Sequence, residues 1–135
     1  QTIKGMVTPL DILEPGGTVI MASTCSEGFG SDDFRAAQDK LVAMGSSAFL
    51  EMLNAKTFAD IDEWQTEMQL KPMRIGRVCL YTDGLSSGER IATGVEIIED
   101  LDVAIADAIN RAGDTTVAVI PEGPYVVPVA GSSAG

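Results

Sequence analysis

Short apolar runs alternate along this chain with stretches in which apolar residues recur every three or four positions. The apolar runs lie at 18–24, 77–82 and 115–120, and glycine or proline flanks each of them. Runs of this length with little polar alternation predict strands that are buried on both faces. The residues at 94–98 are a candidate for a further short strand, and those at 125–129 for an edge segment.

The stretches between these runs predict helices, because their apolar residues recur every three or four positions and most of them are bounded by capping residues, glycine or proline. The predicted helices are 2–13 with a restart at Pro9, a helix capped by Ser31 and ended by Gly45, 46–56, a helix capped by Thr57 or Asp60 and ended by Pro72, and a helix capped by Asp100 and ended by Gly113. Residues 85–92 are predicted as a short helix or a loop.

Apolar strands that alternate with helices are typical of a parallel sheet covered on both faces. We therefore expect an α/β fold, a three-layer sandwich whose mostly parallel sheet carries helices on both faces. The length of 135 residues fits one domain. We expect this domain to span 1–130 and 131–135 to be a flexible tail.

The charge balance narrows the classes of partner. The chain has 9 basic and 20 acidic residues, a net charge of −11, so it lacks the basic surface that binds nucleic acid or an anionic membrane. No window approaches the roughly 18 apolar residues of a membrane-spanning helix, and we expect no signal peptide. The two cysteines, Cys25 and Cys79, adjoin or occupy apolar runs, which favours a reduced, cytoplasmic protein.

The absence of histidine excludes several chemistries. A Ser-His-Asp triad, a Cys-His pair and a zinc site with histidine ligands all need an imidazole that this chain does not have. With two cysteines as its soft ligands, the chain is also a poor candidate for a soft-metal site. Any reaction that needs imidazole would therefore depend on another domain.

Three turn-rich loops follow the predicted strands, at 25–30, 83–84 and 121–124. In parallel sheets such loops gather at one edge, where ligands bind. The first loop leads into a helix N-terminus whose free amides could hold an anion, although tight turns also need glycine for purely structural reasons. Its glycine spacing matches neither a dinucleotide fingerprint nor a P-loop. The candidate anion-binding residues are Gly28, Gly30 and Ser31.

Three single residues have a structural and a functional interpretation. Cys25 precedes a helix that could stabilise a thiolate, but a structural thiol is favoured because no histidine can activate it. Trp64 lies at helical spacing from Ile61 and Met68, which by itself predicts a core position. Lys4, judged from composition alone, is a solvated lysine.

Several segments together resemble the C-terminal domain of the nickel-dependent lactate racemase family. Residues 1–6 (QTIKGM) resemble the stretch that opens this domain. Residues 16–21 (GGTVIM) and 25–28 (CSEG) resemble its next strand and glycine loop, and 119–128 (VIPEGPYVVP) resemble its closing segment. The resemblance covers nearly the whole chain in order.

This resemblance implies an enzyme of two α/β domains with its active site in the cleft between them. Such enzymes use a nickel-pincer nucleotide to move the α-hydrogen of a small 2-hydroxy acid as hydride, and they return it on either face. The acid–base histidines, the nickel-ligating histidine and the lysine that tethers the cofactor all belong to the N-terminal domain. The resemblance therefore implies that this chain has no catalytic or metal-binding residue of its own, is inactive alone and works with that N-terminal catalytic domain.

The resemblance also assigns roles to three residues. Lys4 resembles the lysine that reaches the substrate carboxylate, as a flexible point charge can. Gln1 resembles the glutamine that donates a further hydrogen bond to the substrate. Trp64 lies at about the family's distance from Lys4 and resembles a tryptophan beside the cofactor, where an apolar wall would exclude water from the hydride path.

Other classes of function remain open at this point. The chain could be a non-catalytic α/β module that binds a small anion at the glycine loop or binds a protein, because fold alone does not fix function. A thiol enzyme that uses Cys25 is a third hypothesis, and it would require a depressed thiol pKa.

Overall fold

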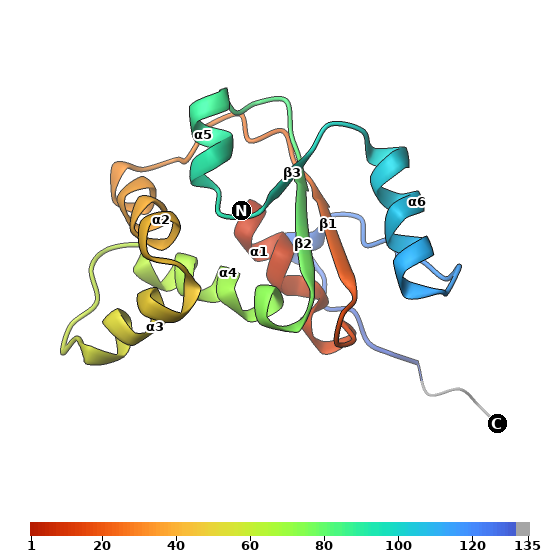
Figure 1. The fold of residues 1–135 in the computed structure, drawn as a ribbon, viewed down its shortest axis with the longest axis horizontal. Helices are drawn as coiled ribbons and strands as arrows, with labels where there is room; N and C mark the ends of the chain where they lie inside the picture. Colours follow the sequence, from red (N-terminus) through yellow and green to blue (C-terminus); the bar gives the residue numbers. More distant parts are fainter. Residues whose placement is uncertain (132–135) are drawn as a thin grey trace.

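The computed structural model describes residues 1–131. These residues contain an open three-stranded parallel sheet with the strand order β1-β2-β3 (Figure 1). The strands are β1 (Thr18–Ala22), β2 (Arg77–Tyr81) and β3 (Glu96–Ile98). Thr18 lies opposite Arg77, and Cys79 lies opposite Glu96. The predicted strands at 18–24, 77–82 and 94–98 are therefore confirmed. Of the predicted tail, residues 132–135 lie outside the described residues.

Six α-helices surround this sheet, with α1 and α4 on one side of it and α6 on the other (Figure 1). The expected α/β fold with a parallel sheet between helices is thus confirmed. The helices are α1 (Thr2–Val7), α2 (Asp32–Met44), α3 (Ser46–Ala55), α4 (Glu63–Ile75), α5 (Ser87–Ala92) and α6 (Leu101–Ala112), with 3₁₀ turns η1 (Thr8–Asp11) and η2 (Gly123–Tyr125). Within residues 1–131, none of these helices has the length and apolar character needed to cross a membrane.

Local sequence explains where two of the longer helices, α2 and α6, begin. The Ser31 hydroxyl accepts a hydrogen bond from the Phe34 N–H and caps α2, and the Asp100 carboxylate caps α6 through the Val103 N–H. Each cap satisfies a backbone donor that the helix itself cannot pair.

The core consists of three apolar clusters that fix the helices to the sheet. One lies between α1 and the sheet, one among α2, α3 and α4, and one beneath α6. They are respectively Met6, Val19, Val78, Leu80 and Leu85; Leu41, Phe49 and Leu70; and Cys79, Ile98 and Ala104. Full burial of a large apolar side chain stabilises a fold by roughly 1.5–3 kcal/mol, so the first cluster is what holds the short helix α1 in place.

The structure corrects the predicted end of one helix. Pro72 does not end its helix but lies inside α4, which continues to Ile75. The helix tolerates it because a proline in the last turn removes a single hydrogen bond, and its carbonyl still accepts from the Gly76 N–H at 3.0 Å.

Residues 115–120 form no strand within the described part of the chain, and neither do 125–129. Val117 and Val119, which would share one face of a strand, are 49% and 83% exposed. On the other face Ala118 is exposed and Ile120 is half-buried, so neither face of this run is fully buried. A run with strand composition forms a strand only beside another strand, and none of the three described strands pairs with it.

The loop after β2 passes unusually close to the loop after β1. A Cβ atom at Gly84 would lie 1.9 Å from the Thr24 carbonyl oxygen, a contact that neither backbone can avoid without moving. Glycine is therefore required at this position, and it brings the two loops at the carboxyl edge of the sheet together.

We predict that Gly84→Ala lowers the free energy of unfolding by about 2 kcal/mol or more, because the added methyl overlaps backbone. Gly88→Ala is the matched control, since a Cβ there meets nothing within 4 Å and alanine is the better helix former by up to about 1 kcal/mol. Urea denaturation of both variants checks this. Equal stability of the two would contradict the close approach at Gly84.

Candidate functional site

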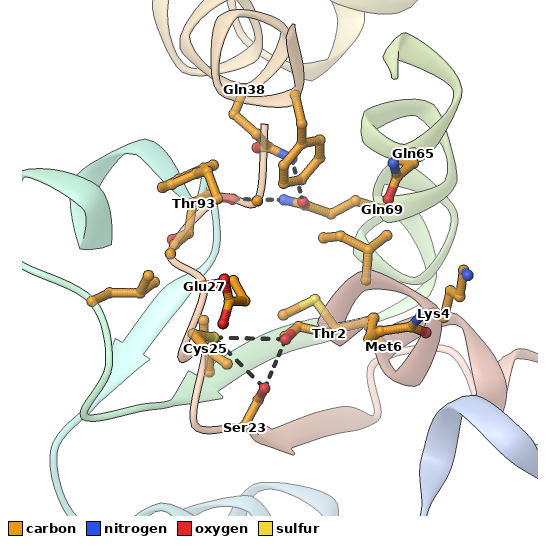
Figure 2. Close-up of a pocket in the computed structure, with 18 of the residues that line it drawn as sticks. Thr2, Lys4, Met6, Ser23, Cys25, Glu27, Gln38, Gln65, Gln69 and Thr93 are labelled. Carbon is orange, nitrogen blue, oxygen red and sulfur yellow. Dashed lines mark hydrogen bonds between the residues drawn. The ribbon is translucent and has the colours of Figure 1, made fainter. Parts of the chain in front are cut away.

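A cavity of about 550 Å³ opens between α1, the loop after β1, α2 and α4 (Figure 2). Its wall combines polar groups from all four elements with an apolar floor. The lining includes Gln1, Thr2, Lys4, Met6, Ser23, Cys25, Glu27, Gly28, Gly30, Ser31, Phe34, Gln38, Asp62, Gln65, Gln69, Leu80, Leu85 and Thr93. The cavity thus lies at the carboxyl end of β1, where ligands bind in parallel sheets.

A triangle of hydroxyl and thiol groups joins α1 to the end of β1 (Figure 2). The Thr2 and Ser23 hydroxyl oxygens are 2.7 Å apart, and the Cys25 sulfur lies 3.6 Å from each of them. Cys25 has φ +48°, in the left-handed region that residues other than glycine rarely adopt. These contacts hold the thiol in the cavity wall and fix the first turn of α1 beside it.

Buried amides form a second network on the side of α2 and α4. The Gln69 amide donates to the Thr93 carbonyl at 2.8 Å, which fixes its oxygen as the acceptor for the Gln38 amide, also at 2.8 Å. Gln38 is 1% exposed, and within residues 1–131 its carbonyl oxygen has no donor. This network could not be predicted from the sequence, because Gln38 and Gln69 lie on different helices and meet only when α2 packs against α4.

The predicted anion loop lines the same cavity, but its donors are engaged within the protein. The Gly28 and Gly30 N–H groups donate to the carbonyls of Cys25 and Glu27, each at 2.9 Å. The Ser31 hydroxyl caps α2 and donates to an Asp62 carboxylate oxygen at 2.7 Å. Anion binding at Gly28, Gly30 and Ser31 stays a prediction, and it would require other donors or a rearranged loop.

Lys4 lies at the α4 edge of this cavity (Figure 2). It also lines a smaller neighbouring hollow of about 340 Å³. The second hollow, which we call the Lys4–Trp64 hollow, is lined by Ile3, Lys4, Val7, Thr8, Asp11, Trp64, Gln65, Met68, Pro124, Val126 and Val127. The Lys4 side chain is exposed, and within residues 1–131 it forms no ion pair. Gln1 lines the first cavity three residues away.

Trp64 lies on the exposed face of α4, so the core position that its helical spacing predicts is wrong. Trp64 is 55% exposed, while the buried face of α4 carries Glu63, Thr66 and Gln69. Those polar groups are buried because partners from α2 and α3 satisfy them, which hydrophobic periodicity cannot reveal. The structure therefore brings Trp64 and Lys4 together in one hollow.

The comparison with known proteins identifies the family of this arrangement. Residues 1–128 match the family described as the lactate racemase C-terminal domain. The chain belongs to this family. A search of curated proteins finds no match. Membership of a family of C-terminal domains implies an N-terminal domain in the same protein.

The donor set of this lactate racemase C-terminal domain does not fit a nickel site. Within residues 1–131, no three histidine, cysteine, aspartate or glutamate side chains gather where they could hold a metal ion. Cys79 is fully buried in the core, and burial raises the pKa of its thiol. A metal cofactor would therefore need its ligands from elsewhere in the protein.

An ion cluster around the buried Glu63 carboxylate fixes the first turn of α4, in which Trp64 lies. The Glu63 carboxylate, 1% exposed, accepts hydrogen bonds from Lys56 at 2.6 Å, the Asp60 N–H at 2.8 Å and Lys40 at 3.4 Å. Burial raises the pKa of Glu63, but these three hydrogen bonds together outweigh it, and the pKa lies below its ordinary value of 4.5.

We predict that Glu63→Gln removes about 2 kcal/mol of stability at neutral pH, the usual cost of losing hydrogen bonds to a buried charge. A carboxyl whose pKa falls on folding stabilises the fold above its unfolded pKa, and this contribution is lost as the pH falls through the folded pKa. The stability difference between wild type and variant should therefore shrink as the pH is lowered from about 4.5.

Denaturant titrations at several pH values measure this difference in the lactate racemase C-terminal domain. The matched control is Glu67→Gln, because Glu67 lies one turn further along α4 and forms no ion pair within residues 1–131. A difference that stays constant down to low pH would contradict the role assigned to the Glu63 charge.

Proposed function

We propose that this chain is the C-terminal part of a 2-hydroxy-acid racemase or epimerase, and that it supplies substrate-binding residues to a cleft formed with the N-terminal domain. The observation that carries the proposal is the position of Lys4. It is an exposed ammonium, without an ion pair in residues 1–131, where two hollows meet beside an exposed tryptophan. Membership of the lactate racemase C-terminal domain family supports the same conclusion.

In this proposal Lys4 binds the carboxylate of the 2-hydroxy acid. An ammonium on a flexible chain pairs well with a small anion, and a charge-assisted hydrogen bond is stronger than a neutral one. Gln1 lines the same cavity and donates a second hydrogen bond from its amide. Two donors at one end of the substrate would fix its orientation while leaving the carbon at position 2 free to react.

Trp64 forms an apolar wall of the hollow in which Lys4 lies. Trp64 is 55% exposed, and Met68, Pro124 and Val126 line the same hollow. When the N-terminal domain covers this wall, water is excluded from the reacting carbon, which protects a transferred hydride from side reactions.

The cofactor proposed for the whole protein is a nickel-pincer nucleotide, which accepts and returns hydride when bound. The described residues of this chain do not fit as its ligands. We therefore assign its ligands and the acid–base histidines to the N-terminal domain, and we expect this chain to be inactive alone.

We predict that Lys4→Ala in the full-length protein lowers kcat/KM for a 2-hydroxy acid by about thirtyfold or more, because a hydrogen bond to a charged group is worth about 2 kcal/mol. Lys4→Arg should recover part of the loss, since it keeps the charge but not the shape. Racemisation followed by circular dichroism or chiral chromatography measures both variants.

The matched control for this experiment is Lys71→Ala, because Lys71 lies on α4 and lines neither hollow. Its kcat/KM should stay close to that of the wild type. Unchanged kinetics in Lys4→Ala, or an equal loss in both alanine variants, would contradict the role proposed for Lys4.

A further inference from the structure

The wall of the main cavity contains a buried hydrogen-bond acceptor that no group in residues 1–131 satisfies. Gln38 lines this cavity and is 1% exposed, and its carbonyl oxygen accepts no hydrogen bond from the described residues. Figure 2 shows its amide on the α2 side of the cavity, bonded to Gln69. A buried polar atom without a partner costs free energy and calls for a specific reason. A hydrogen-bond donor that enters the cavity would remove this cost.

The neighbours of Gln38 fix the orientation of its amide. The Gln69 amide donates to the Thr93 carbonyl, which can only accept, so the Gln69 oxygen is left as an acceptor. The Gln38 nitrogen donates to this oxygen at 2.8 Å and to the Thr66 hydroxyl at 3.4 Å. Rotating the Gln38 amide by half a turn would set two acceptor oxygens against each other. The free oxygen of Gln38 is therefore an acceptor in either case, and its donor has to come from a ligand.

Two further groups give the same polarity to this part of the cavity. The Gln65 nitrogen donates to a carboxylate oxygen of Asp62 at 2.8 Å, which leaves the Gln65 oxygen as an acceptor. The exposed Glu27 carboxylate also lines the cavity, and it forms no ion pair in the part of the chain that the structure describes. The α1 side instead carries Lys4 and Gln1, whose nitrogens are donors. The cavity thus has donors at one end and acceptors along the rest of its polar wall.

We propose that the 2-hydroxy acid taken by this domain carries at least one hydroxyl group besides the one at position 2, and that Gln38 accepts a hydrogen bond from it. This inference rests on the proposed function, which places the carboxylate of the acid at Lys4 and Gln1. The remainder of the acid then lies in the cavity of about 550 Å³, along the wall that carries the acceptors.

The chemistry of this wall disfavours other substituents on the acid. A hydrocarbon chain leaves the Gln38 oxygen without a donor. A second carboxylate has no donor at neutral pH and is repelled by Glu27. An ammonium group would lose its hydration beside the neutral amide of Gln38, which costs more than the burial of a hydroxyl. A neutral hydroxyl group is therefore the donor that suits this position.

Three acids with the same carbon chain test this inference in the full-length protein. They are 2-hydroxybutanoate, both diastereomers of 2,3,4-trihydroxybutanoate, and 2-hydroxybutanedioate. Titration calorimetry measures Kd, and chromatographic separation of the stereoisomers measures kcat/KM. The wild type should prefer a trihydroxy acid to 2-hydroxybutanoate by about tenfold or more, because the acid without the extra hydroxyl groups leaves a buried acceptor unpaired.

A variant at Gln38 tests which residue produces this preference. Gln38→Met keeps the length of the side chain and removes the acceptor, so the ratio between the two acids should fall close to one. Glu67→Gln is the matched control, because Glu67 lies on α4 and does not line the cavity, and it should keep the wild-type ratio. A general loss of stability affects both acids alike and leaves their ratio unchanged.

The outcomes separate this inference from the proposed function. Equal use of 2-hydroxybutanoate and the trihydroxy acids, with binding that Lys4→Ala weakens, would overturn the inference and leave the function of Lys4 standing. Tighter binding of 2-hydroxybutanedioate, or a preference that survives in Gln38→Met, would also overturn it. Failure of all three acids to bind or react would overturn the proposed function, and the inference with it.

Discussion

The position of α1 is the constraint on which the candidate site depends. A helix of six residues is not stable by itself, so its place is set by what it packs against. Met6 is 1% exposed beneath it, Gly5 packs against the end of the Met21 side chain of β1, and the Thr2 hydroxyl bonds to Ser23 just after β1. Lys4 lies between these residues in the chain, so its backbone is held at one edge of the cavity while its exposed side chain can change conformation.

The same logic explains why α4 buries its polar face. Glu63, Thr66 and Gln69 face inward because α2 and α3 offer a charge or an amide to each of them. Breaking one such buried pair is costly, since it leaves an uncompensated polar group. These hydrogen bonds and the fully buried Leu70 side chain together fix the rotation of α4. This rotation leaves Trp64 exposed in the hollow that it shares with Lys4. The burial of these polar side chains and the exposure of Trp64 therefore both follow from the same rotation of α4.

Sequence patterns predicted those parts of this fold that depend on local information. The apolar runs at 18–24 and 77–82 form strands because they pair with each other in the parallel sheet. The run at 115–120 has the same composition but pairs with none of the three strands of residues 1–131, which composition cannot reveal. Trp64 was misplaced because helical spacing assumes an apolar inner face. The site roles of Lys4 and Gln1 came from a family resemblance and remain predictions, since their position depends on tertiary packing.

The overall charge of the chain is informative about how an anionic substrate would be held. A net charge of −11 repels a carboxylate at long range, but salt screens such a field beyond about 8 Å under physiological conditions. Binding must therefore depend on short-range contacts, and an ammonium that its own acidic neighbours do not neutralise is the group that can make one. Lys4 forms no ion pair within residues 1–131, although Asp11 lines the same hollow. A cation of this kind beside the exposed apolar surface of Trp64 is what half of the proposed interdomain site would present.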